Sequence, residues 1–252
     1  MNRIVEGWDR TYSAGRGCMW YPDEGLVRFI ARFLKMRVSV DKFEVKRKVG
    51  RVIDVGCGNG RHVVLFAEQG FDVWGTDPSS RAITYTRDWL IKRDLNATLN
   101  VCDGEQLPYA GEFFDVAVCF GVLDHVRFYK AKKIMREIHR VLSPKGLFYV
   151  SLRSFEDVEA PGNHDNTCVL DSGYEEGLIQ HFFDKSEVCE LLRGFEVLDV
   201  EVHDERFPAF LGKDKSFNQT SKGVKDPIDL KQPFTWSKYS RWHLGCRKKE
   251  VR

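Results

Sequence analysis

Arg51–Gly60 reads Arg-Val-Ile-Asp-Val-Gly-Cys-Gly-Asn-Gly, so a short apolar run ends abruptly in glycines. Such a run is typical of a buried parallel strand, and residues 61–68 have the length and apolar content of a helix start. Glycine has no Cβ, so Gly56, Gly58 and Gly60 allow a sharp turn that brings main-chain amides close to a ligand. The helix that follows presents unpaired N–H groups and the positive end of its dipole. The stretch therefore predicts a strand–loop–helix unit that suits a carboxylate or a phosphate.

Strand and helix patterns alternate along the next hundred residues. Apolar strand patterns cover residues 71–76, 97–102, 114–120 and 146–152, and helical patterns cover residues 79–92 and 130–142. Repeated strand–helix units with buried apolar strands predict an α/β fold, in which a parallel sheet is covered by helices on both faces. Ligands of such sheets bind beyond the carboxyl ends of the strands, at the topological switch point.

Acidic residues stand at two of these expected strand ends. Asp77 lies 77 − 60 = 17 residues after the last glycine, and its carboxylate is placed to accept both hydroxyls of a ribose. The alternative is that Asp77 only caps the helix that follows, although Ser79 is also placed to do so. Asp103 is placed to accept from an adenine amino group, and Gly104 allows close backbone approach. A strand, a glycine loop and a later acid are shared by dinucleotide and S-adenosylmethionine sites, so the loop alone does not separate them.

The motifs of residues 50–152 together resemble those of class I S-adenosylmethionine-dependent methyltransferases. The resemblance rests on Asp54–Gly60, Asp77, Asp103-Gly104, Phe114-Asp115 and Leu142–Gly146. It implies a Rossmann-like three-layer sandwich, whose seven-stranded, mostly parallel sheet has an antiparallel last strand. Residues 195–202 and 242–248 would supply the last pair of strands. We expect a single domain over residues 1–252, with a helical cap (1–49), a cofactor-binding core (50–153) and two insertions that shape the acceptor site (154–180 and 205–238).

The resemblance also implies S-adenosylmethionine as cofactor and S-adenosylhomocysteine as product. The residues expected to bind it are Asp54, Gly56, Cys57, Gly58, Asn59, Gly60, Asp77, Pro78, Cys102, Asp103, Gly104 and Phe120. Class I enzymes commonly use the N-terminal segment as a lid. Trp8 and Tyr12 share a face if that segment is helical, and Arg16 would then meet the methionine carboxylate. The alternative is a terminal helix that only packs its aromatic side chains on the domain.

Methyl transfer from a sulfonium is an in-line displacement, so alignment of the acceptor supplies most of the catalysis, and a base helps only where the acceptor loses a proton. Asp124 and His125 follow the strand that ends near Phe120, and His181 precedes two phenylalanines that look like anchors. These three are the candidate catalytic residues, and each histidine is alternatively a surface or packing residue. The candidate substrate-binding residues are Tyr21, Arg153 and Phe182.

Composition and missing motifs narrow the acceptor. The net charge of +2 implies no general attraction to nucleic acid or membrane, and the chain lacks the Asn/Asp-Pro-Pro-aromatic motif of base amino-methylases. We therefore expect a small-molecule acceptor, such as a sugar, a metabolite or an inorganic oxyanion. An RNA or tRNA acceptor stays open because residues 205–238 are basic. Two competing hypotheses are a non-catalytic module that binds S-adenosylmethionine and an oxidoreductase.

The remaining expectations concern the environment of the protein. Seven cysteines without a CxxC pair argue against a zinc site and fit reduced cytosolic thiols. The sequence shows neither an apolar signal core nor a run of 18 apolar residues, so we expect no metal, no membrane association and a cytoplasmic protein. A monomer or a homodimer is expected.

Overall fold

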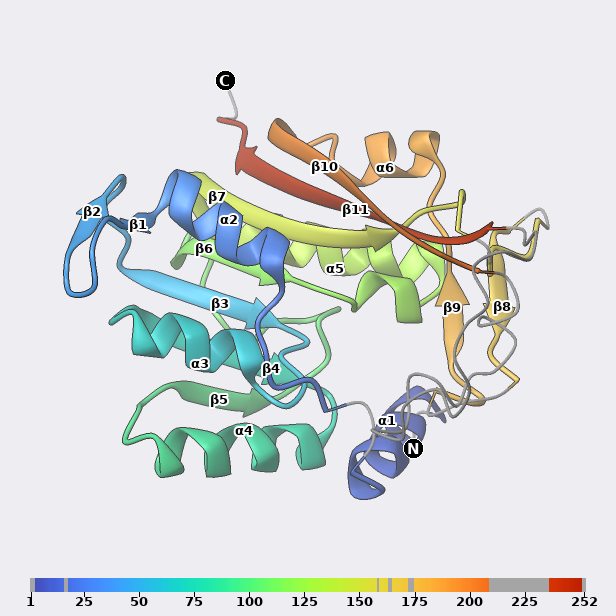
Figure 1. The fold of residues 1–252 in the computed structure, drawn as a ribbon, viewed down its shortest axis with the longest axis horizontal. Coiled ribbons are helices and arrows are strands. Elements are labelled where there is room, and N and C mark those ends of the chain that lie inside the picture. Colours follow the sequence, from blue (N-terminus) through green and yellow to red (C-terminus); the bar gives the residue numbers. More distant parts are fainter. Residues whose placement is uncertain are drawn as a thin grey trace.

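The computed structural model describes residues 3–15, 18–157, 159–162, 165–171, 175–208 and 236–250. Its centre is a seven-stranded sheet with the order β10-β11-β7-β6-β3-β4-β5 (Figure 1). The strands are β3 (Arg51–Val55), β4 (Asp72–Asp77), β5 (Thr98–Val101), β6 (Phe114–Cys119), β7 (Leu142–Arg153), β10 (Phe195–Pro208) and β11 (Trp236–Lys248). The predicted strand–loop–helix unit supplies the central strand β3.

The pairing of the strands confirms the predicted Rossmann-like, mostly parallel sheet. β3 pairs in parallel with β4 and β6, β4 with β5, and β6 with β7. β11 is antiparallel to both of its neighbours, β7 and β10, so it is the predicted antiparallel last strand. The chain runs outward from β3 to β5 and then returns to β6 on the other side of β3. This reversal is the switch point at which parallel sheets bind their ligands.

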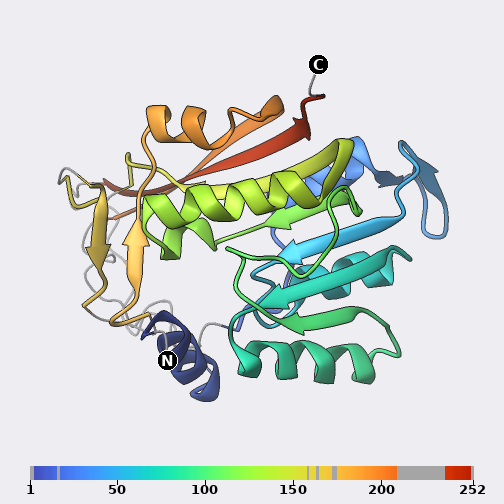
Figure 2. The same ribbon diagram turned by 180° about the vertical axis from the view of Figure 1, so that it is seen from behind.

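Helices cover both faces of the sheet and close two apolar cores (Figures 1 and 2). The helices α2 (Glu24–Phe33), α3 (Arg61–Glu68) and α4 (Ser80–Lys92) belong to one face, and α5 (Phe128–Val141) and α6 (Lys185–Leu191) to the other. Alternate residues of β6 serve the two cores, because successive side chains of a strand point to opposite faces. Val116 and Val118 pack toward α2 and α3, whereas Ala117 and Cys119 pack toward α5. All four are fully buried, which explains the uninterrupted apolar run in the sequence.

Two further elements lie beyond the carboxyl ends of the parallel strands. One is α1 (Arg3–Ser13), and the other is a hairpin of β8 (Thr167–Val169) with β9 (Ile179–His181) (Figure 1). The insertion expected over residues 154–180 contains β8 and most of β9, which ends at His181. A second hairpin, of β1 (Lys35–Arg37) with β2 (Phe43–Val45), lies at the opposite end of β3.

The insertion expected over residues 205–238 is only partly described. β10 and β11 extend into it as far as Pro208 and from Trp236, and residues 209–235 lie outside the described residues. The division of the chain into cap, core and insertions stays a prediction. No helix in the described part of the chain is both long and apolar enough to cross a membrane.

Candidate functional site

A cavity of about 250 Å³ opens at the switch point. Its walls come from the loops after β3, β4, β5 and β6, from α1, and from residues of the β8–β9 hairpin. Four consecutive residues of the glycine loop, Gly56–Asn59, line it together with Asp77, Pro78, Asp103 and Gly104. The convergence of strand ends predicted from the sequence is therefore present in the structure.

The glycine loop adopts backbone conformations that other residues rarely reach. Gly56 has φ 75° and Gly58 has φ 54°, both in the left-handed region. A methyl carbon added to Gly56 would lie 2.2 Å from a methyl group of Val122, and one added to Gly58 would lie 2.7 Å from the hydroxyl oxygen of Tyr12. Because Gly56 and Gly58 have no side chains, the main chain of the loop can contact a ligand in the cavity directly.

Asp77 lies beside this loop, and each of its carboxylate oxygens accepts a hydrogen bond from a main-chain amide. Oδ2 accepts from the N–H of Gly58 over 2.9 Å, and Oδ1 accepts from the N–H of Ser79 over 2.8 Å. Burial raises the pKa of Asp77 to about 6. The side chain of Ser79 caps α4 by accepting from Ala82, so the interpretation of Asp77 as the cap of this helix is wrong. Each oxygen of Asp77 keeps lone-pair capacity for a hydroxyl group of a ligand.

Asp103 lines the same cavity from the loop after β5. Its Oδ1 accepts from the N–H of Glu105 over 3.0 Å, which fixes the carboxylate. A methyl carbon on Gly104 would lie 3.2 Å from Val55, so the chain approaches β3 closely here. Asp77 and Asp103 therefore place two acceptors for hydroxyl or amino groups on one half of the cavity.

Asp54 lies within β3, next to the glycine loop, with 1% of its surface exposed. Its Oδ2 has no hydrogen-bond partner within the part of the chain that the structure describes. Burial raises the pKa of Asp54 to about 7, while the charge of Arg61 acts in the opposite direction. An unpartnered buried carboxylate is costly, so this position favours a ligand that supplies a donor.

His125 faces the other half of the cavity from the short 3₁₀ helix η1 (Leu123–His125). Its Nδ1 lies 3.1 Å from the carbonyl oxygen of Ile179. Because a carbonyl oxygen only accepts, Nδ1 carries the proton and Nε2 of the neutral ring is an acceptor. Nε2 lies 3.8 Å from Oε1 of Glu175, and the ring of Trp8 packs edge-to-face at 4.9 Å. The ring of His125 is thus oriented from three sides.

Asp124 does not face the cavity, contrary to its predicted catalytic role. Its side chain is fully buried. Oδ1 accepts from the N–H of Arg153 over 2.7 Å, and Oδ2 accepts from the guanidinium of Arg241. Both oxygens hold neighbouring elements in place, so Asp124 positions the site and leaves proton transfer to other groups.

His181 is also outside the cavity lining, which corrects its proposed role as a base. Its side chain is 1% exposed, with Nδ1 2.8 Å from the hydroxyl of Thr167 and Nε2 3.3 Å from Glu187. Gln180 precedes it on β9 and does line the cavity. Since side chains alternate along a strand, His181 faces the opposite side and packs against Phe183.

The predicted substrate residues are placed unequally. Arg153 lines the cavity, but Asp157 and Glu159 hold its guanidinium at 3.2 and 3.1 Å. Phe182 is fully buried beneath this guanidinium and does not reach the cavity. Tyr21 is 86% exposed and takes part through its carbonyl oxygen, which accepts from Arg61 over 3.0 Å.

The predicted cofactor residues mostly gather at the cavity. Trp8, Tyr12, Cys57, Asn59 and Phe120 line it, so α1 contributes to the cavity wall, and its role as a lid stays a prediction. Gly60 and Cys102 stand behind the lining, as does Asp54. Arg16 lies outside the described residues.

Several residues of the lining escaped the sequence analysis. They are Met19, Arg61, His62, Glu175, Gln180 and Arg241. Arg61 directly follows the glycine loop, so its place at the first turn of α3 was available as a signal. Arg241 comes from β11 and offered no local signal.

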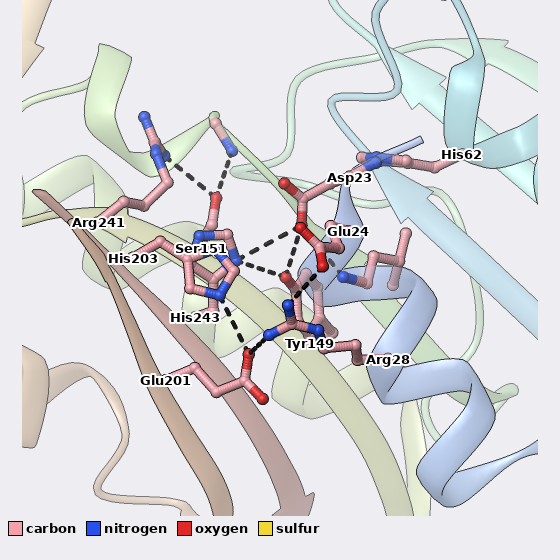
Figure 3. A network of polar contacts seen from close by, with 12 residues as sticks. Asp23, Glu24, Arg28, His62, Tyr149, Ser151, Glu201, His203, Arg241 and His243 are labelled. Carbon is pink, nitrogen blue, oxygen red and sulfur yellow. Dashed lines mark hydrogen bonds and ion pairs between the residues drawn. The ribbon is translucent and has the colours of Figure 1, made fainter. Parts of the chain in front are cut away.

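A buried polar network lies behind the cavity wall (Figure 3). His62 Nε2 accepts from the N–H of Asp23 over 3.2 Å. Oδ1 of Asp23 accepts from the hydroxyl of Tyr149 over 2.9 Å, and His243 Nδ1 lies 2.6 Å from that hydroxyl. The network joins α2, α3, β7 and β11, so it fixes the residues of the lining relative to the sheet. The described residues contain no group of three or more histidine, cysteine or acidic side chains that could hold a metal ion.

Residues 53–150 match the protein-family model described as "Methyltransferase domain". A ubiquinone biosynthesis O-methyltransferase of Sinorhizobium fredii is 26% identical over 144 residues, which cover 52% of this chain and 57% of the relative. A ubiquinone/menaquinone biosynthesis C-methyltransferase of Bordetella avium is 34% identical over 104 residues, which cover 40% of each chain. The chain therefore spans about half the length of the curated relatives it matches.

Solved structures share the fold over more of the chain. An S-adenosylmethionine-dependent methyltransferase of Methanosarcina mazei has a TM-score of 0.61 at 20% identity, covering 81% of this chain and 95% of that one. The [4+2]-cyclase SpnF has a TM-score of 0.62 at 19% identity, covering 98% and 96%. At such identities the likeness shows the fold alone, and one fold supports different reactions.

Proposed function

Because the chain belongs to the class I S-adenosylmethionine-dependent methyltransferases, we propose that it transfers the methyl group of that cofactor to a small-molecule acceptor by in-line displacement. The observation that carries the proposal is the meeting of the glycine loop, Asp77 and Asp103 at one cavity, with His125 on the opposite half. The half of the cavity with the glycine loop, Asp77 and Asp103 suits an adenosyl moiety. The half that His125 faces is then available to the acceptor.

The residues present fit the cofactor. Asp77 would accept the ribose hydroxyls and Asp103 the adenine amino group. Oδ2 of Asp54, which stands directly behind the lining, would act on the methionine end from there. The cradle at Gly56 and Gly58, which a Cβ would fill, supports a close main-chain contact. When bound, the cofactor supplies a methyl group activated by a positively charged sulfur.

The chain contributes alignment, exclusion of water and a proton acceptor. Trp8 and Tyr12 of α1 lie over the cavity, and Phe120 forms an apolar wall. His125 presents Nε2 as an acceptor because Ile179 fixes its other nitrogen. An acceptor whose hydroxyl or amino proton points at this nitrogen would be held for attack and would lose its proton there.

The same proposal covers the surroundings of the enzyme. A small acceptor is supported by the cavity beneath α1 and the β8–β9 hairpin, and by the small-molecule pathways in the names of the relatives. The seven cysteines without a CxxC pair support a reducing, cytoplasmic location. An RNA acceptor and a non-catalytic binding module are the competing functions, and the oligomeric state stays a prediction.

Two measurements test the proposal. Thermal stability should rise with S-adenosylhomocysteine and not with NAD, because a ligand that binds only the native state stabilises it. Protein incubated with methyl-labelled S-adenosylmethionine should label a small-molecule extract and leave total RNA unlabelled.

His125→Gln should lower that labelling while S-adenosylhomocysteine affinity stays within about twofold, since His125 contributes to the transition state rather than to ground-state binding. Labelled RNA, or binding without labelling of either fraction, would favour the competing functions.

A further inference from the structure

Two guanidinium groups line the acceptor half of the cavity and flank one aromatic ring. The guanidinium carbon of Arg61, the first residue of α3, lies 4.8 Å from the centre of the Phe120 ring. That of Arg241, on β11, lies 5.6 Å from the same centre. The two like charges therefore share one small region of the wall.

The positive charge there is only partly compensated. Arg153 is neutralised by Asp157 and Glu159, and Arg241 by the buried carboxylate of Asp124. Arg61 instead donates to the carbonyl oxygen of Tyr21 and to the sulfur of Met19. Within the described part of the chain, Arg61 forms no ion pair with a carboxylate.

The acids nearest to Arg61 act on it only at longer range. One is Asp23, whose oxygen is already bonded to the hydroxyl of Tyr149 (Figure 3). The other is Asp54, whose pKa is raised to about 7 by burial. Burial lowers the pKa of Arg61, and the charge of Arg241 acts in the same direction, whereas Asp23 and Asp54 oppose it. Arg61 is thus a partly buried cation without a directly paired carboxylate among the described residues.

A neutral donor on the same half of the cavity lacks an acceptor. Gln180 lines the cavity with 1% of its surface exposed, and its Nε2 has no hydrogen-bond partner among the described residues. A buried amide donor without a partner is uncommon, and a ligand that accepts hydrogen bonds would satisfy it. Gln180 therefore offers an unsatisfied donor, and Arg61 and Arg241 each make the bonds described above through Nη1, so Nη2 of each guanidinium can donate to a ligand.

We propose that Arg61 and Arg241 form a subsite for an anionic group of the acceptor, with Phe120 packing against the apolar part of the same molecule. The inference rests on the proposed function and adds the class of substrate: a small carboxylate, phosphate or comparable oxyanion joined to an apolar body. Arginine suits such groups because its planar fork donates two parallel hydrogen bonds and stacks on aromatic rings.

The order of the strands assigns this subsite to the acceptor. Asp77 ends β4 and Asp103 follows β5, whereas Arg241 lies on β11, and β7, β6 and β3 stand between. Arg241 is thus on the other side of the switch point from the adenosyl half, whereas Arg61 begins the helix after β3 and its guanidinium reaches across to the ring of Phe120, after β6. The carboxylate of the cofactor is the other source of the same chemistry, and the experiment separates the two.

Binding of benzoate to protein saturated with S-adenosylhomocysteine tests the subsite by calorimetry, with benzamide as the neutral match. Benzoate should bind at least about tenfold more tightly than benzamide, because hydrogen bonds to charged groups exceed those to neutral ones. Arg61→Gln should remove most of that preference. Arg87→Gln, which changes an exposed arginine of α4, is the matched control and should keep it.

Arg241 needs a double variant, because its loss alone would leave Asp124 buried without a partner. Arg241→Gln combined with Asp124→Asn should keep the thermal stability close to that of Asp124→Asn alone and lose the benzoate preference. Equal binding of benzoate and benzamide to the wild type, or a benzoate preference that survives both the Arg61 and the Arg241 changes, would overturn the subsite.

A second comparison shows whether Arg61 binds the anionic group of the acceptor or the carboxylate of the cofactor. Affinities for S-adenosylhomocysteine and for 5′-methylthioadenosine, which lacks the amino-acid carboxylate, are compared in Arg61→Gln. Equal retention of both affinities supports the acceptor. Selective loss of S-adenosylhomocysteine affinity would assign Arg61 to the cofactor carboxylate and overturn the proposal. If the wild type binds neither compound, the proposed function fails, and that failure is seen before any anion is added.

Discussion

The N–H of Gly58 donates to Oδ2 of Asp77 over 2.9 Å, and this bond ties the glycine loop after β3 to the carboxylate that ends β4. The same carboxylate is the proposed acceptor of the ribose hydroxyls, so loop and ligand share one group. Asp77→Ala should therefore weaken S-adenosylhomocysteine binding at least about tenfold, since hydrogen bonds to a charged group are lost together with the anchor of the loop. Calorimetric titration measures the change.

The raised pKa of Asp77 adds a pH dependence. Burial raises it to about 6 in the protein without ligand, so Asp77 takes up a proton as the pH falls through that value. The protonated acid accepts fewer hydrogen bonds, so affinity should fall by up to about tenfold per pH unit below 6. Asp77→Asn should flatten the curve between pH 5 and pH 7.5. A wild-type affinity that is constant across this range would contradict the role given to the carboxylate.

Gly58 should be sensitive to any side chain for two separable reasons. Its φ of 54° strains a residue with a Cβ by about 1–2 kcal/mol, and the added carbon would lie 2.7 Å from the hydroxyl oxygen of Tyr12. Gly58→Ala should abolish the thermal shift with S-adenosylhomocysteine. In Gly58→Ala/Tyr12→Phe the nearest remaining ring atom would be 3.7 Å away, so part of the shift should return. An unchanged shift in Gly58→Ala alone would show that the loop does not contact the ligand.

The sequence predicted those residues of the site that belong to short local motifs. The glycines of the loop, Asp77 and Asp103 each follow a recognisable strand, and parallel strands bring such ends to one edge. The pairing of Arg241 with Asp124 spans 117 positions and depends on the register of β11 against β7. No local pattern carries that register.

His181 shows a different limit. The two phenylalanines after it were expected to aim its ring at the acceptor. Whether a residue of a strand faces a cavity depends on a shift of one position, because side chains alternate. On β9 the side chain of Gln180 faces the cavity, and that of His181 faces the protein interior. Because the sequence did not indicate the β8–β9 hairpin, it could not indicate which side chains of β9 point into the cavity.

His62 should make the protein sensitive to acid. Burial lowers its pKa from 6.5 to about 3, so between these values the unfolded chain binds a proton that the native protein does not. The stability that this neutral histidine contributes is fully present above pH 6.5 and is lost as the pH falls toward 3, by roughly 1.4 kcal/mol per unit. His62→Gln keeps an acceptor for the N–H of Asp23 and has no such proton.

Urea denaturation at pH 7.5 and pH 4.5 tests this. The difference in free energy of unfolding between wild type and His62→Gln should shift by about 2.7 kcal/mol in favour of the variant at the lower pH. Other acids and histidines titrate equally in both proteins and cancel in the comparison. The same difference at both pH values would mean that His62 is protonated as easily in the native state as in the unfolded one.

We predict that α1 acts as a lid and controls how long a ligand stays bound. The helix is attached to α4 by the hydroxyl of Tyr85, which donates to the carbonyl oxygen of Tyr12 over 3.2 Å, and by the pair of Ser79 with Asp9. Tyr85→Phe removes one hydrogen bond, worth about 1 kcal/mol, without touching the cavity lining. Release of S-adenosylhomocysteine, followed by displacement in a stopped-flow instrument, should then be about fivefold faster, whereas association should change little. Tyr129→Phe removes the hydroxyl of an exposed tyrosine on α5 and should leave release unchanged. Equal release rates in Tyr85→Phe and the wild type would show that α1 packs on the domain without gating the site.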